Sequence, residues 1–371
     1  MTIGLATIYN VPNYGSVLQT YATQELLKSL GHEVHVIQYN YFNERYYRER
    51  GYGATWRERF YPFKEIAMPW CRAAELKRFR KNHLNFTKRF DCIESLSQYD
   101  WGVYDAFVVG SDQVWNTKFL LGDPGFLLQF APSDKPRFSL SSSFATKTVD
   151  SKYEHLFREE LSKFKALSVR EENGVEIIQK QLHIEKHVEV TLDPTLLLSK
   201  SQWVELFSHK PKHRKPYILY YMLSYAFEPR PYVYEVVQHF QQQLNCDVIA
   251  LEGIRDSADC KTVRFIDADN SSIGDFIDLF NNASMVITTS FHGTAFALNF
   301  GVPLVSIVPD NCGDDRQTTL LKNCGAETCV TKIGTPLTSI HPYYNTNEVS
   351  EKLEALRKKS IHWIKDNIVS F

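Results

Sequence analysis

The chain reads MVITTSFHG over residues 285 to 293, an apolar run that leads directly into a helix-like segment. Met285 to Ile287 have the character of a buried strand. In open α/β sheets, ligands bind at the carboxyl ends of the strands, where a helix N-terminus offers backbone N–H groups to an anion. This position predicts that His292 is an acid or base beside an anionic ligand. The alternative is a His that caps a core helix.

The same alternation of strands and helices extends back through the N-terminal half. A first strand and its helix are followed by Gly31, which ends the helix before the next strand begins. A strand–helix–strand unit implies parallel strands joined by a right-handed crossover. The pattern predicts strands at 3–9, 33–39, 106–109, 137–142, 166–169 and 188–192, with later helices at 153–164 and 174–182.

The C-terminal half repeats this order of elements. Strands are predicted at 217–222, 247–250, 262–266, 285–289, 304–308 and 328–330, and helices at 232–244, 273–282, 293–300, 316–323 and 347–367. The fold class is therefore α/β, with two doubly wound Rossmann-like domains that face each other across a cleft. The expected domains are residues 1–198 with an insertion at 43–90, residues 199–345, and a C-terminal helix at 346–371.

Composition narrows the class of protein. The chain has 371 residues, 43% apolar content and a net charge of -1, which is typical of a globular protein with no overall attraction to nucleic acid. Its seven Cys form no Cys-x-x-Cys pair, so reduced thiols are expected and a zinc site is not. The N-terminus lacks a signal-like pattern and no apolar stretch reaches 18 residues, so a cytoplasmic location is expected.

The insertion at residues 43–90 has a different composition from the rest. It carries thirteen Lys or Arg against five Glu, with Tyr, Trp and Phe interleaved among the cations. Such a segment suits peripheral contact with the anionic inner face of the plasma membrane, or with a diphosphate. The alternative is a solvated helical pair whose aromatic side packs in the core. Nucleic acid is not expected, because no recognised nucleic-acid module accompanies the patch.

Two polar segments follow strands of the N-terminal half. Asn13, Tyr14 and Gly15 come after the first strand, but they form neither a Gly-x-Gly-x-x-Gly fingerprint nor a P-loop. The segment GSDQVWN at 110–116 concentrates a hydroxyl, a carboxylate, an amide and an aromatic ring. That mixture suits a sugar, whose hydroxyls need hydrogen bonds and whose apolar face stacks on rings. The alternative for Asp112 is a helix N-cap.

Two arginines are candidates for binding an anion. Arg170 directly follows an apolar strand, where a guanidinium can hold a carboxylate or phosphate through two hydrogen bonds. Its alternative is an ion pair with Glu171 or Glu172. Arg316 follows the loop at 310–315, and its alternative is a surface role.

Five motifs, in order and at their spacing, resemble the polysaccharide pyruvyl transferase family over residues 3 to about 325. They are NYG at 13–15, VGSDQVWN at 109–116, SVRE at 168–171, DPTLL at 193–197 and SFHGTA at 290–295. The resemblance implies a fold similar to the GT-B glycosyltransferases, phosphoenolpyruvate as donor and a pair of hexose hydroxyls as acceptor. Some members carry an Arg two residues before the motif His, where this chain has Ser290. Since Ser290 has no positive charge, Arg170 and Arg316 become the main candidates for binding the phosphate of the donor.

The expected reaction needs at least one acid and one base. His292 and Asp112 are the predicted catalytic pair, without a metal or a cofactor other than the donor substrate. Donor binding is assigned to Arg170, Ser290, Gly293 and Arg316, and acceptor binding to Asn13, Tyr14, Gly15, Ser111, Gln113 and Trp115. The acceptor is expected to be a hexose of a surface polysaccharide or of its polyprenyl-diphosphate-linked precursor. The open alternatives are a nucleotide-sugar glycosyltransferase of the same architecture and a non-catalytic glycan-binding protein.

Overall fold

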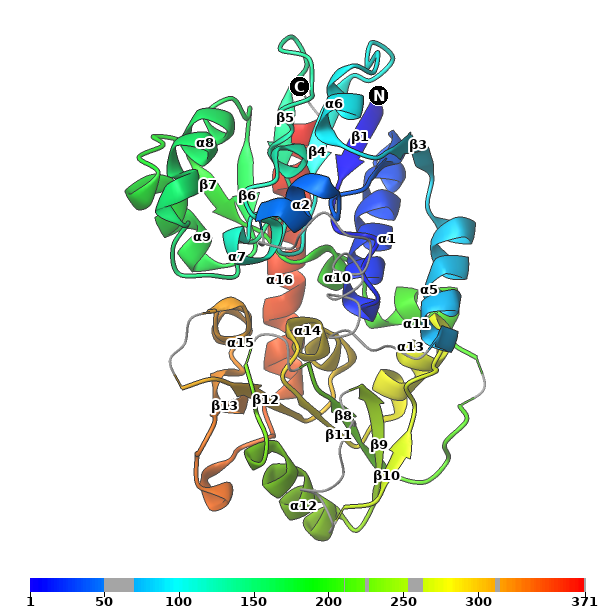
Figure 1. Cartoon of the computed structure of the whole chain (residues 1–371). Helices are drawn as coiled ribbons and strands as arrows, with labels where there is room; N and C mark the ends of the chain where they lie inside the picture. The colour runs from blue at the N-terminus through cyan, green and yellow to red at the C-terminus, as the bar shows by residue number, and fades with distance from the viewer. Residues whose placement is uncertain (50–69, 210, 224–226, 253–262, 311–313, 370–371) are drawn as a thin grey trace. The chain divides into compact units, whose positions relative to one another are not determined.

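The computed structural model describes residues 1–49, 70–209, 211–223, 227–252, 263–310 and 314–369 (Figure 1). The chain divides into two compact units. The first comprises Met1–Met68, Lys77–Leu197 and Lys359–Phe371, and the second comprises Pro69–Leu76 and Leu198–Lys358. The helix α16 (Thr346–Ile364) therefore contributes residues to both units.

The first unit is built on a five-stranded parallel sheet with the order β3-β2-β1-β4-β5. β1 lies in the middle and the chain winds outward from it in both directions, which makes the sheet doubly wound. Its strands are β1 (Thr2–Ala6), β2 (Glu33–Tyr39), β3 (Phe86–Phe90), β4 (Ala106–Val109) and β5 (Arg137–Ser139).

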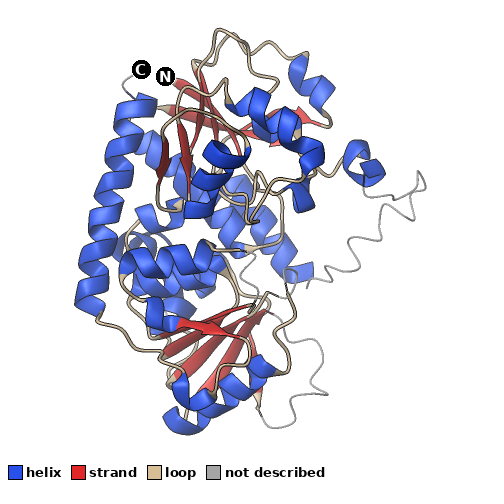
Figure 2. Cartoon of the chain, turned by 90° about the vertical axis from the view of Figure 1, so that its left-hand side faces the viewer, coloured by secondary structure: helices blue, strands red, loops and turns tan. Residues whose placement is uncertain are grey.

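Helices lie on both faces of this sheet (Figure 2). The described helical segments of the first unit include α1 (Tyr14–Ser29), α2 (Glu44–Glu49), α6 (Ile93–Ser97), α7 (Thr117–Leu120), η1 (Pro124–Leu127), α8 (Ser151–Leu161), α9 (Glu172–Glu176), η2 (Ile177–Gln181) and α10 (Pro194–Leu197). α5 (Trp70–His83) belongs to this unit from Lys77 onward, and η5 (Lys365–Val369) ends the described chain.

The second unit contains a six-stranded parallel sheet with the order β10-β9-β8-β11-β12-β13. Counted along the chain this is the order 3-2-1-4-5-6 of a Rossmann fold. Its strands are β8 (Tyr217–Tyr221), β9 (Asp247–Glu252), β10 (Phe265–Asp267), β11 (Met285–Thr288), β12 (Leu304–Val308) and β13 (Val330–Lys332). Its described helical segments, besides parts of α5 and α16, are α11 (Lys200–Phe207), α12 (Tyr232–Leu244), α13 (Ile273–Asn282), α14 (Phe291–Phe300), α15 (Arg316–Cys324), η3 (Glu327–Cys329) and η4 (Leu337–Ser339).

Burial explains why these segments form strands. Every residue of β4, β8, β11 and β12 is buried, as expected for parallel strands covered by helices on both faces. The helices that cover them begin at side-chain caps. Ser272 caps α13 and Ser290 caps α14, each accepting a hydrogen bond from a backbone N–H of the first turn.

The α/β class and the parallel sheets are confirmed, but several predicted strands need correction. β5 ends at Ser139 rather than Ser142, and β13 spans Val330–Lys332 rather than 328–330. β1 ends at Ala6 rather than Tyr9, because Thr7 and the residues after it enter the loop before α1. The insertion contributes β3, an edge strand that was not predicted, since FTKRF alternates only partly. β6 (Leu167–Val169) and β7 (Val188–Val190) form a separate two-stranded sheet, which isolated bridges such as Phe138 to Ala166 join to the first.

Candidate functional site

The loop after β4 is held in a strained conformation by buried hydrogen bonds. Asp112 has a φ of 74°, a left-handed value that is uncommon outside glycine and that recurs at functional sites. One of its carboxylate oxygens accepts a hydrogen bond from the Ser16 hydroxyl at 2.5 Å. The other accepts one from the Gln113 backbone N–H at 2.8 Å. Asp112 thus ties the start of α1 to the end of β4, a role that its predicted function as an acceptor base did not include.

Arg170 lies beside Asp112, but its guanidinium is already paired within the first unit. Its side chain is 0% exposed. Its Nη1 lies 2.8 Å from an Asp193 oxygen, its Nη2 lies 3.5 Å from Asp112, and its Nε lies 3.9 Å from Glu171. The structure therefore places Arg170 in an ion-pair network, which corrects the expected contact with the donor. Glu171 was the ion-pair partner considered in the alternative reading of the sequence.

Asp193 is the partner in this network that sequence reasoning missed, whereas Glu171 was named in the alternative for Arg170. Asp193 accepts hydrogen bonds from the Ser111 hydroxyl at 2.7 Å and from the Thr195 hydroxyl at 2.6 Å. Glu171 accepts hydrogen bonds from the Ser143 hydroxyl at 2.9 Å and from the Phe144 N–H at 2.8 Å. Asp193 belongs to the DPTLL motif, so the sequence did contain a signal for it. Its Asp-Pro dipeptide, however, is most simply interpreted as a turn. Only the fold brings Asp193 to Ser111 and Arg170.

The loop between β1 and α1 is fastened to the loop after β4. Asn13 caps α1 by accepting a hydrogen bond from the Ser16 N–H at 3.2 Å, and Tyr14 and Gly15 are buried. The buried Gln19 amide donates to the Thr7 hydroxyl, the Ile8 carbonyl and the Ser16 carbonyl. The Thr7 hydroxyl in turn donates to the Ser111 carbonyl at 2.9 Å. Asn13, Tyr14 and Gly15 therefore shape this loop, and their predicted contact with an acceptor stays a prediction.

Trp115 does not present a ring to a sugar. The residue is 1% exposed, its indole N–H donates to the Phe126 carbonyl at 3.1 Å, and its ring packs on Phe144 at 5.1 Å. The predicted sugar platform is therefore wrong for this residue, because the indole is needed in the core. Gln113 is the half-buried member of the segment, and its side-chain oxygen accepts a hydrogen bond from Asn116 at 2.7 Å.

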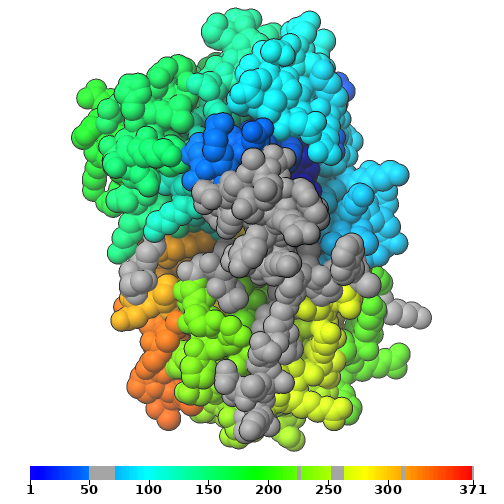
Figure 3. Space-filling view, viewed as in Figure 1, coloured from blue at the N-terminus to red at the C-terminus, as the bar shows by residue number. Residues whose placement is uncertain are grey.

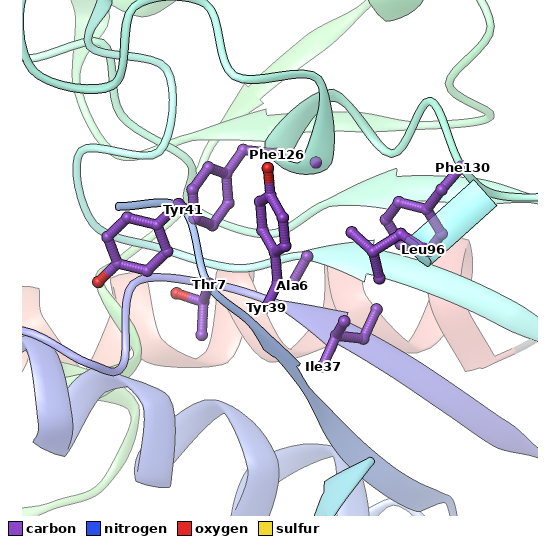
Figure 4. Close-up of a pocket in the computed structure, with 9 residues that line it drawn as sticks. Ala6, Thr7, Ile37, Tyr39, Tyr41, Leu96, Phe126 and Phe130 are labelled. Atoms are coloured by element: carbon purple, nitrogen blue, oxygen red, sulfur yellow. The ribbon is translucent and has the colours of Figure 1, made fainter. Parts of the chain in front are cut away.

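A small cavity of the first unit lies in the same core. Tyr39, Leu96 and Phe126 contribute to its walls, and apolar side chains make up most of the remainder (Figure 4). These three residues also belong to the hydrophobic cluster that packs on the sheet. The cavity is thus an internal space of the core and not the predicted acceptor site.

The second unit places His292 in the first turn of α14, directly after the buried strand β11. The His292 residue is 5% exposed, and its ring lies edge-on to Phe291 at 5.3 Å. Ser290 is the N-cap, and its hydroxyl accepts a hydrogen bond from the Gly293 N–H at 3.3 Å. The hydroxyl of Ser290 therefore serves the helix. A phosphate contact for this residue stays a prediction.

Gly293 has a steric role in bringing α14 close to the sheet. A Cβ at this position would lie 2.3 Å from the Thr288 hydroxyl oxygen and 2.9 Å from the Tyr221 ring. Only a glycine allows that approach, so packing accounts for Gly293 independently of any donor contact.

Arg316 begins α15 and is buried next to the first turn of α14. Its guanidinium lies 5.8 Å from the centre of the Phe291 ring. Its Nε donates to both carboxylate oxygens of Asp314, at 2.8 and 2.9 Å, and its Nη2 pairs with the same carboxylate. The predicted surface alternative is wrong, since Arg316 is buried. The guanidinium lies beside the Phe291 ring and already holds a carboxylate.

The predicted basic insertion is only partly described. Arg50, Arg57, Arg59 and Lys64 lie outside the described residues. Arg45 is a structural residue, because it pairs with Glu49 at 2.8 Å and with the buried Asp123 at 3.1 Å. The exposed cations of the described part are Arg48 on α2, Lys77, Arg78 and Lys81 on α5, and Lys88 and Arg89 on β3; Figure 3 shows the surface of α2 and α5.

Across the described ranges, no group of three or more His, Cys, Asp or Glu side chains is arranged to hold a metal ion. Within the same ranges, no helix has both the length and the apolar character needed to cross a membrane.

Comparison with known proteins gives a family and a fold. The family model described as polysaccharide pyruvyl transferase matches residues 13–311. No curated protein matches the sequence. Among solved structures, the UDP-GlcNAc 2-epimerase of Neisseria meningitidis bound to UDP-GlcNAc is 13% identical with a TM-score of 0.52, and each chain is covered to 100%.

A second solved structure gives the same result. The Staphylococcus aureus MnaA–UDP co-structure is 12% identical with a TM-score of 0.54, and 99% of this chain and 91% of that chain are covered. At these identities the likeness shows the fold alone, that of the GT-B type proteins with two Rossmann-like units.

Proposed function

The chain belongs to the polysaccharide pyruvyl transferase family, and from that membership we propose that it forms a pyruvate ketal on a hexose, using phosphoenolpyruvate as donor. The observation that carries the proposal is the family match over residues 13–311, which includes the His292 segment in the first turn of α14. The acceptor belongs to a surface polysaccharide or its lipid-linked precursor.

The reaction balances without an external oxidant or reductant. The methylene carbon of phosphoenolpyruvate gains a proton, and one sugar hydroxyl oxygen adds to the neighbouring carbon as its own proton leaves. The bond from that carbon to the phosphate oxygen breaks and phosphate departs. The second hydroxyl then adds to the same carbon and loses its proton, which completes the ketal. The proton gained by the methylene carbon and those lost by the hydroxyls need groups that titrate near neutral pH.

His292 is the group to which we assign proton transfer. Imidazole titrates near neutral pH and can act as acid or base. Its place in the first turn of α14 puts it at the carboxyl end of β11, where parallel α/β units bind anionic ligands. Asp112 is assigned to the acceptor side, where its carboxylate already accepts a hydrogen bond from the Ser16 hydroxyl. A sugar hydroxyl that displaces Ser16 can give its proton to the same carboxylate.

Arg316 is the residue that we assign to the donor carboxylate or phosphate. Its bidentate pair with Asp314 supports this assignment, because a carboxylate of the donor is the same chemical group and fits the same guanidinium geometry. The donor must then compete with Asp314. Arg170 is not assigned to the donor, because its side chain and that of Asp193 are both 0% exposed, whereas the Asp314 carboxylate that holds Arg316 is 26% exposed.

Ligand stabilisation and product analysis test the proposal together. Phosphoenolpyruvate should raise the midpoint of thermal unfolding, whereas UDP-sugars and GDP-sugars should not. Incubation with phosphoenolpyruvate and free or lipid-linked galactosides should release phosphate. The mass of the galactoside should increase by that of a pyruvyl group bound as a ketal. Stabilisation by nucleotide sugars alone would favour the glycosyltransferase alternative. His341→Ala, which changes an exposed His of the same unit, is the matched control for His292→Ala.

Peripheral contact with an anionic membrane is proposed for the basic insertion. Each Lys or Arg near an anionic bilayer contributes on the order of 1 kcal/mol of attraction. Because Arg45 is structural, we choose Lys77, Arg78, Lys81 and Lys88 for neutralisation to Gln. Co-sedimentation with phosphatidylglycerol vesicles at low salt should weaken in that variant. Equal binding by both proteins, or by neither, would count against the membrane contact.

A further inference from the structure

Two hydrogen-bond donors of the first unit lie near the carboxyl ends of β1 and β2, one bonded to the Tyr9 carbonyl of the loop after β1 and the other in the segment after β2, and no anion among the described residues neutralises them. One is the guanidinium of Arg80, on the part of α5 that belongs to the first unit. The other is the hydroxyl of Tyr41, two residues after β2. Neither residue was placed in the site by the sequence motifs.

Tyr41 is buried in an unusual way. The residue is 1% exposed, and its hydroxyl has no hydrogen-bond acceptor among the described residues. Figure 4 shows this hydroxyl pointing away from the Phe126 and Leu96 side chains of the core cavity, so the cavity does not explain it. The Asn10 backbone N–H faces the hydroxyl oxygen, but the O–H group itself has no acceptor in the described chain. A buried donor without an acceptor costs stability, and a ligand that accepts a hydrogen bond would remove that cost.

Arg80 is partly buried and lacks a carboxylate partner in the described chain. Its one hydrogen bond there runs from Nη1 to the Tyr9 carbonyl at 3.3 Å, which leaves the other N–H groups of the guanidinium available. Burial lowers the pKa of Arg80, and the titratable groups that face it are the hydroxyls of Tyr41 and Tyr9, which stay uncharged because burial raises their pKa. A guanidinium in that state attracts an anion.

Neighbouring residues hold the two donors in place. Phe79, next to Arg80 on α5, packs edge-on against Tyr21 of α1 at 5.6 Å. The Tyr41 ring packs on Phe126 at 5.3 Å. Asp112 also faces Tyr41, and burial together with the charges of Tyr9 and Asp112 raises the pKa of Tyr41. Since Ser16, Gln113 and Arg170 engage the Asp112 carboxylate, it does not neutralise Arg80.

We propose that Arg80 and Tyr41 form a phosphoryl subsite of the first unit, which binds the diphosphate of a glycosyl diphosphate acceptor. The guanidinium and the phenol O–H both donate hydrogen bonds. A phosphate dianion presents acceptor oxygens, so it matches these two donors. Asp112, on the side of Tyr41, would then face the hydroxyls of the attached sugar. The identity of the acceptor rests on the proposed function, whereas the subsite itself rests on the two donors.

Binding of inorganic pyrophosphate, measured by calorimetry at low salt, tests the subsite directly. Arg80→Gln should weaken binding by about tenfold or more, as expected for the loss of a charged hydrogen bond. Tyr41→Phe should weaken it about threefold or more, since a neutral donor is lost. Lys81→Gln is the matched control, because it removes one exposed charge from the same helix and should leave binding within about twofold of the wild type. Unchanged pyrophosphate binding in Arg80→Gln would overturn the proposal.

Stability separates a ligand-binding role from a structural one. Tyr41→Phe removes a hydroxyl that has no acceptor, so its thermal midpoint should equal or exceed that of the wild type while binding is lost. A lower midpoint with unchanged pyrophosphate binding would make Tyr41 a structural residue and would overturn its part in the subsite.

Further ligands identify the source of the phosphoryl group. A short-chain prenyl diphosphate galactose should bind more tightly than methyl galactoside, and Arg80→Gln should abolish that difference. If Arg80→Gln instead removes stabilisation by phosphoenolpyruvate alone, the assignment to the acceptor is overturned. Arg80-dependent pyrophosphate binding in a protein that transfers no pyruvyl group would leave the subsite standing and refute the proposed function.

Discussion

Replacing Arg170 by Met should destabilise the first unit without a specific effect on the donor. The guanidinium is fully buried and faces Asp193, Asp112 and Glu171. Removing one partner of a buried ion pair typically costs about 3–5 kcal/mol, because the remaining charge is left uncompensated. Asp193 and Asp112 keep hydroxyl and N–H donors, but each loses its cation. We therefore expect the loss to fall in that range.

Urea unfolding followed by tryptophan fluorescence measures this loss. With a slope of about 3 kcal/mol per molar urea, the midpoint should fall by about 1 to 1.7 M. Arg137→Met is the matched control, since Arg137 is buried and pairs with Glu160 at 3.1 Å in the same unit. It should also destabilise the unit. A double variant with Asp193→Asn should show a coupling energy of at least about 1 kcal/mol, because it removes both charges of the closest pair.

Catalysis by the folded fraction decides between the two roles of Arg170. If the network is structural, the KM for phosphoenolpyruvate should stay within about threefold of the wild type, as for other variants that leave substrate contacts intact. A loss of stability below about 1 kcal/mol, together with a KM raised tenfold or more, would refute the structural reading. It would return Arg170 to the donor site.

Three further outcomes are expected. His292→Ala should lower turnover at least about a hundredfold while the unfolding midpoint stays near that of the wild type, and near-normal turnover would remove His292 from proton transfer. Gly293→Ala should cost about 1–3 kcal/mol in urea unfolding, because the new Cβ would lie 2.3 Å from the Thr288 hydroxyl oxygen. Burial lowers the pKa of His32, so the unfolded chain binds its proton more tightly and the free energy of unfolding should fall as the pH drops below about 6.5. His32→Leu should flatten that part of the stability profile, and an unchanged profile would assign the acid sensitivity to other groups.

Much of the architecture could be predicted from local patterns. β2, β4, β12, α12 and α13 were predicted with the bounds that the structure has, because each is an apolar or amphipathic run with a clear start and end. β3 escaped prediction because FTKRF gains its strand conformation from pairing with β2 at the sheet edge. β1 was predicted too long, since apolar residues continue after the strand into a buried loop.

The candidate site could be predicted only in part, for a physical reason. His292 was identified from its neighbours in sequence, because a strand end and a helix start are local features. The closest partner of Arg170 was not, since Asp193 is a loop residue whose approach to Ser111 depends on the packing of β6, β7 and α10. Trp115 reads equally well as a sugar platform or a core residue until its burial is known.

The sequence by itself determined the class of fold, the order of the strands along the chain and the family, because these follow from periodicity and from motifs that are contiguous. Tertiary structure alone decided which charged groups are already paired. Arg170 and Arg316 proved to hold carboxylates of the chain itself, whereas Arg80, one cation among thirteen in the insertion, has no carboxylate partner in the described chain. Charge pairing acts over a few ångströms between segments that are distant in sequence, so no local pattern records it.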